Sequence, residues 1–151
     1  STTAFPSGVW GSQIETTEAV APVIFHKREL RTDSGGAGKY RGGLGQRIEV
    51  SSAIDQDFMV FLSVERILNP AEGRNGGHTG AAGRIRIGEN GSDIAGKGEL
   101  RVENGKTLIF ETPGGGGFGD PSERDPEKVA CDLSAGVISD AAARTVYGKR
   151  S

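Results

Sequence analysis

Residues 33–45 read Asp33-Ser-Gly-Gly-Ala-Gly-Lys-Tyr-Arg-Gly-Gly-Leu-Gly45, and six of these thirteen residues are glycines. A short alternation of polar and apolar residues follows at positions 47–50. Glycine loses more backbone entropy on folding than any other residue, so such a dense cluster needs a structural reason. Three reasons fit: positive φ angles, a close approach of two backbones, or amide groups that face a ligand.

Two more stretches have the same character. The chain contains 25 glycines in 151 residues, which is more than twice the usual share of about 7%. Sixteen of them fall in residues 33–45, 73–83 and 114–119, which we call the first, second and third glycine segments. Neither a collagen-like period nor a low-complexity tract is present, and 151 residues suffice for one domain.

The charge balance disfavours a nucleic-acid partner. The formal net charge is −2 with both signs well mixed, whereas nucleic-acid binding favours a basic face. Residues 125–150 hold four acids and four bases, so they lack the footprint of a helix-turn-helix DNA reader. The chain has no apolar run of about eighteen residues and only one cysteine, so we expect a cytoplasmic protein without a membrane partner.

Alternating and apolar runs predict strands over 23–31, 46–52, 84–87, 100–103 and 106–110. The run 58–64 is almost entirely apolar, which favours a strand that is covered on both faces. Asn104-Gly105 lies between two of the predicted strands, and this pair is the strongest short-range signal for a type I′ hairpin.

The final quarter predicts two short helices. Asp125 can cap the first, with Pro126 at its first position and Gly136 at its end. Ser139 can cap the second, which would run to Tyr147; helices this short must dock on the β body or on a neighbouring domain. We therefore expect an α+β fold that is mainly β, with antiparallel hairpins, glycine-rich loops and a two-helix tail. Its divisions are an extended lead-in (1–22), a β-rich body (23–120) and a helical tail (121–151).

The sequence does not match the familiar phosphate-binding, dinucleotide-binding and metal-binding motifs. Tyr40 follows Gly38-Lys39 where a phosphate-binding P-loop needs Ser or Thr. The third glycine segment contains Gly-x-Gly-x-x-Gly, but Asp120-Pro121 follows where a dinucleotide site would open a helix. The two histidines and the cysteine have no metal-ligand spacing, so we expect no metal site. We interpret Ser1 as a chain boundary rather than an N-terminal nucleophile.

Two interpretations of the glycine segments stay open. Their amides could form a nest for an anionic oxygen, assisted by Arg31, Arg41, Arg66 or Arg74. Alternatively, they let chains cross closely at an interface, with Asp33 and Arg41 paired internally. In both cases we expect contact with a ligand, a domain or a subunit outside this segment.

Ser34 is more typical of an Asp-Ser-Gly turn than of a nucleophile. His78 is more typical of a solvent-facing loop than of a ligand-binding site. The candidate substrate or interface residues are Asp33, Ser34, Arg41, Arg66, His78, Gly114, Gly115, Gly116 and Gly117.

Long motifs in a fixed order resemble the C-terminal part of the hydantoinase B/5-oxoprolinase family. They are residues 29–45, Gly73 with Gly76-Gly-His-Thr-Gly80, Thr112-Pro-Gly-Gly-Gly-Gly-Phe-Gly-Asp-Pro121, and 124–129 with 143–148. The family's loop prefers Pro after Arg31, where this chain has Thr32.

The resemblance implies a part of a B-type subunit in an ATP-dependent hydrolase of cyclic amides. A hydantoinase A-type subunit would bind ATP and phosphorylate the substrate, while the remainder of the B-type subunit, before this segment, would hold any divalent metal. By this resemblance the segment itself binds no cofactor and has no activity alone. Two alternatives remain for the function of the chain. It could be the same segment of an ATP-dependent ketone carboxylase, or a purely structural assembly module.

Overall fold

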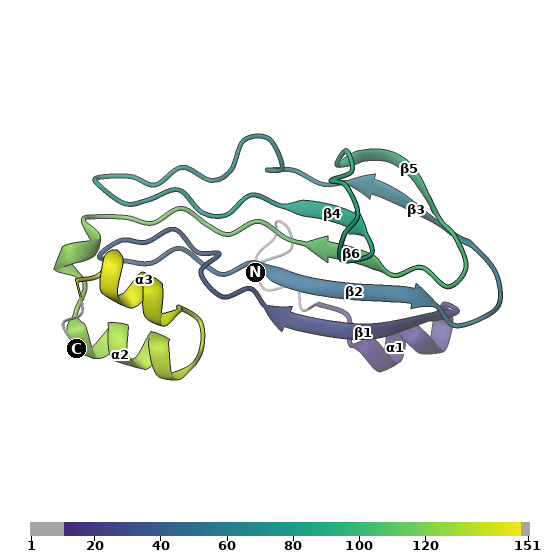
Figure 1. Cartoon of the computed structure of the whole chain (residues 1–151), viewed down its shortest axis with the longest axis horizontal. Helices are drawn as coiled ribbons and strands as arrows, with labels where there is room; N and C mark the ends of the chain where they lie inside the picture. The colour runs from purple at the N-terminus through teal and green to yellow at the C-terminus, as the bar shows by residue number, and fades with distance from the viewer. Residues whose placement is uncertain (1–10, 149–151) are drawn as a thin grey trace.

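The computed structural model describes residues 11–148, so the expectation for Ser1 lies outside the described part. Two β-sheets occupy one end of an elongated molecule and two helices the other, with the glycine segments running between them (Figure 1). In chain order the elements are α1 (Ile14–Val20), β1 (Val23–Leu30), β2 (Gln46–Ser52), β3 (Phe58–Ser63), β4 (Arg84–Ile87), β5 (Lys97–Val102), β6 (Leu108–Glu111), a 3-10 turn (Pro121–Glu123), α2 (Pro126–Ser134) and α3 (Asp140–Thr145). The α+β class, with two helices near the C-terminus, agrees with the sequence.

The larger sheet has four antiparallel strands in the order β1-β2-β6-β4. Alternation along β2 and β4 separates the side chains: Ile48, Val50, Ile85 and Ile87 belong to one face, while arginines and glutamates occupy the other. The register places Arg47 of β2 and Arg84 of β4 on either side of Glu111 in β6. One face is therefore apolar and the other charged.

The apolar face packs against a second sheet, which β3 and β5 form. Ile85, Val102 and Leu108 are buried in the core, and alternate residues of β3, including Val60, pack against them. The expectation that β3 is covered on both faces is wrong for this chain, because Phe61 is 76% exposed. Its sheet has only two strands, so the second face has nothing over it among residues 11–148.

Asn104-Gly105 forms a turn but not the expected hairpin. The amide of Lys106 donates to the carbonyl of Glu103 over 3.1 Å, and only Gly105 of the pair has positive φ, whereas a type I′ turn needs it at both central residues. The strands before and after the turn join different sheets. Asp57 holds the turn from the outside, by accepting a 2.7 Å hydrogen bond from the Asn104 amide.

The lead-in is not wholly extended, since α1 lies within it and contacts β1. Gln13 stands at its N-cap without a side-chain capping bond to the described helix, so the sequence carried no start signal. The helix is fixed by tertiary contacts, among them a 2.7 Å hydrogen bond from the Phe25 amide to Glu18. Between residues 11 and 148 no helix is both long enough and apolar enough to span a bilayer.

Both predicted caps in the tail are confirmed. Asp125 accepts from the amide of Glu127 and Ser139 from the amide of Ala142. Val129, Ile138 and Ala143 form a small buried core between α2 and α3. The second helix ends at Thr145, two residues before Tyr147, and Tyr147 packs against this core instead.

Candidate functional site at the glycine bundle

The three glycine segments hydrogen-bond to one another through their backbones, and we call the assembly the glycine bundle. The amide of Gly36 donates to Gly115 over 2.8 Å, joining the first segment to the third. Gly117 donates to His78 over 2.9 Å, and His78 donates to Ala37 over 2.7 Å, so the second segment contacts both of the others. In a flat three-stranded sheet the two outer strands do not contact each other. Here every pair of the three segments is joined by backbone hydrogen bonds.

Glycine is required at the bundle because the backbones approach too closely for a side chain. A Cβ atom on Gly36 would lie 2.1 Å from the carbonyl oxygen of His78, and one on Gly117 would lie 2.1 Å from that of Ala37. Neither glycine has a positive φ. Close backbone approach is thus the reason for these glycines, as it is at the crowded axis of a triple helix.

The amides of the bundle are occupied within the chain. Gly114 donates to Ala81 over 2.9 Å and Gly115 to Gly43 over 2.8 Å, in addition to the bonds of Gly36 and Gly117. The expectation of an anion nest is therefore wrong for these four amides. The close crossing of the alternative is confirmed between segments of this chain, whereas contact with a domain or subunit outside it stays a prediction.

Ser34 and Arg31 fasten the end of the bundle next to the sheet. The buried Ser34 hydroxyl donates to the Arg31 carbonyl over 2.6 Å and accepts from the Gly45 amide over 2.9 Å. The Arg31 guanidinium donates to the carbonyl of Ala82 in the second segment (3.0 Å) and to that of Thr112 just before the third (2.6 Å). The turn interpretation of Ser34 is confirmed, and both hydroxyl bonds serve the backbone.

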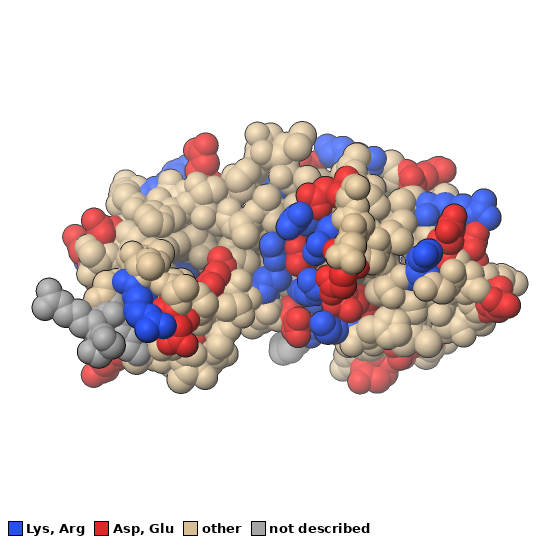
Figure 2. Space-filling view, in the orientation of Figure 1, with Lys and Arg blue, Asp and Glu red and all other residues tan. Residues whose placement is uncertain are grey.

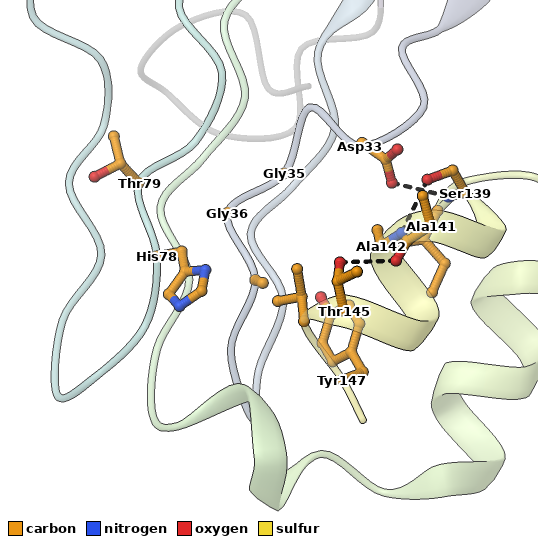
Figure 3. A pocket seen from close by; sticks show the side chains of 13 residues that line it. Asp33, Gly35, Gly36, His78, Thr79, Ser139, Ala141, Ala142, Thr145 and Tyr147 are labelled. Atoms are coloured by element: carbon orange, nitrogen blue, oxygen red, sulfur yellow. Dashed lines mark hydrogen bonds between the residues drawn. The ribbon is translucent and has the colours of Figure 1, made fainter. Parts of the chain in front are cut away.

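A cavity of about 350 Å³ lies between the bundle and α3 (Figure 3). Asp33, His78 and Ser139 line it, together with the backbone of Gly35 and Gly36. The Asp33 carboxylate accepts a 2.8 Å hydrogen bond from the amide of Ser139. His78 is exposed, as expected, and its ring lies at the cavity on a segment that the backbone holds in place. The cavity thus combines a carboxylate and an imidazole with a rigid backbone wall.

Arg41 joins the bundle to the helical tail. Its Nε lies 3.0 Å from Oδ2 of Asp132, and Nη2 of Arg124 contacts the same oxygen over 2.7 Å. Burial opposes the charge on Asp132, but hydrogen bonds from Arg41 and Arg124 outweigh it, so the pKa of Asp132 lies below its usual range. The expected pairing of Arg41 with Asp33 is wrong, because α2 brings a carboxylate to Arg41 and Asp33 binds the start of α3.

Burial raises the pKa of Tyr147, which lies at the cavity beside the guanidinium of Arg124. The arginine is 5.9 Å from the centroid of the tyrosine ring, within range of a cation–π contact. The same arginine donates to the carbonyl of Lys39 over 3.1 Å, which fixes the tail against the first glycine segment.

A sequence model of the hydantoinase B/oxoprolinase family matches residues 1–121. The chain belongs to this family. It is 33% identical over 150 residues to the beta chain of caprolactamase from Pseudomonas jessenii, covering 89% of this chain and 24% of that relative. It is also 33% identical over 140 residues to a putative B-type D-/L-hydantoinase chain of Pseudomonas sp. strain NS671, covering 89% of this chain and 23% of that one. The chain thus spans roughly a quarter of the length of these relatives.

Solved structures of larger proteins contain the same fold. The ATP-dependent caprolactamase from Pseudomonas jessenii superposes with a TM-score of 0.69 at 31% identity, over 91% of this chain and 25% of that one. Nucleotide-free acetone carboxylase gives a TM-score of 0.73 at 24% identity, over 95% of this chain and 23% of that one, and this likeness concerns the fold alone. The glycine bundle and its tail therefore belong to a fold that larger enzymes contain.

The other candidate substrate or interface residues of this hydantoinase B/oxoprolinase chain do not line the cavity. Arg66 is exposed at φ 60°, a left-handed conformation, and its carbonyl accepts from Gly83. Residues 114–117 form the interior of the bundle and do not line the cavity. Sequence reasoning missed Asp132, and it identified Ser139 only as a helix cap; no local pattern marks either as a partner of the first glycine segment. Within residues 11–148 no group of three or more His, Cys, Asp or Glu side chains could hold a metal ion.

Proposed function

We propose that this chain is the C-terminal part of the B-type subunit of an ATP-dependent enzyme that opens cyclic amides, as a hydantoinase or a 5-oxoprolinase does. The observation that carries the proposal is the 33% identity, over 89% of the chain, to relatives named caprolactamase and hydantoinase. The rest of the B-type subunit and a hydantoinase A-type subunit are the proposed partners. ATP and a divalent metal are proposed for that complex and not for this segment.

The segment's proposed role is to supply a rigid wall at an interface. Backbone hydrogen bonds fix the bundle, and ion pairs of Arg41 and Arg124 fix the tail, so the cavity is pre-formed rather than induced. Rigid placement of a contact surface lowers the entropy lost on binding. His78 and Asp33 are exposed at this wall, and an imidazole and a carboxylate are groups that can accept or donate a proton.

The test is an assay of the complete B-type subunit together with its A-type partner. Ring opening of hydantoin, 5-oxoproline and caprolactam is measured with and without ATP. We expect ATP-dependent opening of at least one of them. Turnover of none, with assembly intact, would contradict the proposal.

A ketone carboxylase is the second candidate, because the acetone carboxylase alpha subunit of Xanthobacter autotrophicus is 27% identical over 95% of this chain. Such an enzyme would consume bicarbonate and ATP with acetone, and would leave the cyclic amides unchanged.

A matched pair of variants separates a contact role from pure assembly. His78→Asn changes the cavity, whereas His26→Asn changes the other histidine, which is also exposed and lies at a bulge in β1. If the cavity contacts substrate or phosphate, the His78 variant lowers turnover and the His26 variant does not. If both leave turnover unchanged, the segment acts in assembly alone.

A further inference from the structure

The charged face of the larger sheet carries a cluster of arginines around one buried glutamate. Glu111 is 8% exposed. Its carboxylate lies 3.3 Å from Nη1 of Arg47 and 3.7 Å from Nη2 of both Arg31 and Arg86. Figure 2 shows charged side chains of both signs gathered across the middle of one face of the molecule. Three guanidinium groups thus share a single carboxylate.

A cavity of about 450 Å³ opens beside this cluster. Its charged lining residues are Arg31, Arg47, Arg84, Glu29 and Glu111. Glu111 is also shared with Arg86, whereas Arg47 and Arg84 have further carboxylate partners beyond the lining, in Glu49, Glu89 and Asp93. Among residues 11–148, Arg31 is thus the lining arginine that has no carboxylate of its own.

Arg31 has the weakest pairing of the arginines that line the cavity. Other arginines of the cluster have close carboxylates elsewhere: Arg47 contacts Glu49 at 2.8 Å, and Arg84 contacts Asp93 at 3.2 Å. Among residues 11–148, Arg31 has only Glu111, at 3.7 Å, and two backbone carbonyls. Burial lowers the pKa of Arg31, and the positive charges of its arginine neighbours lower it further against the pull of Glu111. The Nε of Arg86 is also buried, with no hydrogen-bond acceptor in the described part of the chain.

We propose that this cavity, the arginine basin (Arg31, Arg47 and Arg84 around Glu111), binds a small oxyanion, either a phosphate or a carboxylate. Guanidinium groups present planar pairs of donors that match the oxygens of both anions. An anion would give Arg31 a closer counter-charge than Glu111, whose carboxylate two other arginines share. The arginine basin consists of residues of this chain alone, and anion binding there does not depend on the proposed function.

The basin is joined to the glycine bundle through Arg31. The same guanidinium that lines the basin donates to the carbonyl of Ala82 in the second glycine segment and to that of Thr112 just before the third. An anion that reduces the charge repulsion at Arg31 stabilises this junction. Because the anion binds the folded state, it raises the unfolding temperature.

The test uses the 151-residue chain with inorganic phosphate and, in a separate titration, acetate. Ionic strength is held constant with sodium chloride, because screening alone alters surface electrostatics. Amide chemical shifts of β1, β4 and β6 and the unfolding temperature are followed. Saturable shifts at the basin are expected with at least one anion, and whichever anion binds more tightly identifies the source. No saturable shift with either anion would overturn the proposal.

Removing a positive charge and removing a negative charge from the basin should change the anion affinity in opposite directions. Arg84→Gln removes a half-exposed basin arginine that has an Asp93 partner, and we expect binding to weaken roughly tenfold. Arg101→Gln removes an exposed arginine of β5 that has an Asp57 partner, and it should leave affinity unchanged. Glu29→Gln removes an acid from the basin and should tighten binding about threefold. Equal effects of the Arg84 and Arg101 variants would show that the anions respond only to net charge, and the basin would be refuted.

Discussion

Substituting Gly36 by alanine tests the glycine bundle directly. The added methyl would lie 2.1 Å from the carbonyl oxygen of His78 and 2.6 Å from the amide nitrogen of Gly117. Those two atoms bond to each other over 2.9 Å, and neither is part of a flexible side chain. The backbones must therefore separate, and this bond between the second and third segments is lost.

The expected cost follows from these contacts. Overpacking a tight interior costs about 1–3 kcal/mol, and each buried backbone bond that breaks adds about 1 kcal/mol or more. We expect Gly36→Ala to lower the free energy of unfolding by roughly 3 kcal/mol. For a chain of this size the unfolding temperature would fall by roughly 10 °C.

Gly43 supplies the matched control, because it lies in the same segment without positive φ and a Cβ there would meet nothing within 4 Å among the described residues. Gly43→Ala should be neutral or stabilise by up to about 1 kcal/mol, through a less flexible unfolded chain. Urea unfolding, followed by circular dichroism, measures both variants. Equal stabilities would refute the claim that close backbone approach determines these glycines.

Three further changes test other parts of the fold. Ser34→Ala leaves the buried Gly45 amide without its acceptor, and should lower the free energy of unfolding in urea by about 1–3 kcal/mol; an unchanged value would contradict the fastening role. The pKa of Asp132 is lowered by folding, so its stabilisation is complete above the unfolded value of about 3.9 and is lost as pH falls through the lower folded value; Asp132→Asn should remove that part of the acid dependence in unfolding curves from about pH 7 to about pH 2. Phe61→Thr, on the exposed face of β3, should change the free energy of unfolding by less than about 0.5 kcal/mol, whereas Val60→Thr, on the core face, should cost about 1–3 kcal/mol; comparable losses in thermal unfolding would contradict the assignment of faces.

The sequence predicts the strands well where side chains alternate. Residues 46–52 and 84–87 form β2 and β4 with the expected bounds, because their pattern records which face meets the core. The caps at Asp125 and Ser139 are likewise local, since the bonded amides lie two or three residues away.

Partners that lie far apart along the chain were harder to predict. A glycine carries no side chain that marks what lies beside it, so its neighbours cannot be read from the residue itself. The cavity joins Asp33, His78 and Ser139, which are 45 and 61 positions apart in turn, and no spacing rule connects them. The Asn104-Gly105 turn shows the converse error: its local signal is correct for a turn, but Val102 and Leu108 on either side enter the core from different sheets.

The order of the glycine segments along the chain determines when the bundle can form during synthesis. The third segment contributes the acceptor for Gly36 and the donor for His78, so the earlier two remain without these partners until residue 117 has left the ribosome. Contacts between such distant positions form slowly, because a long loop must close first. A nascent chain that stalls before Pro113 would therefore expose amides and carbonyls of the first two segments whose partners are not yet made.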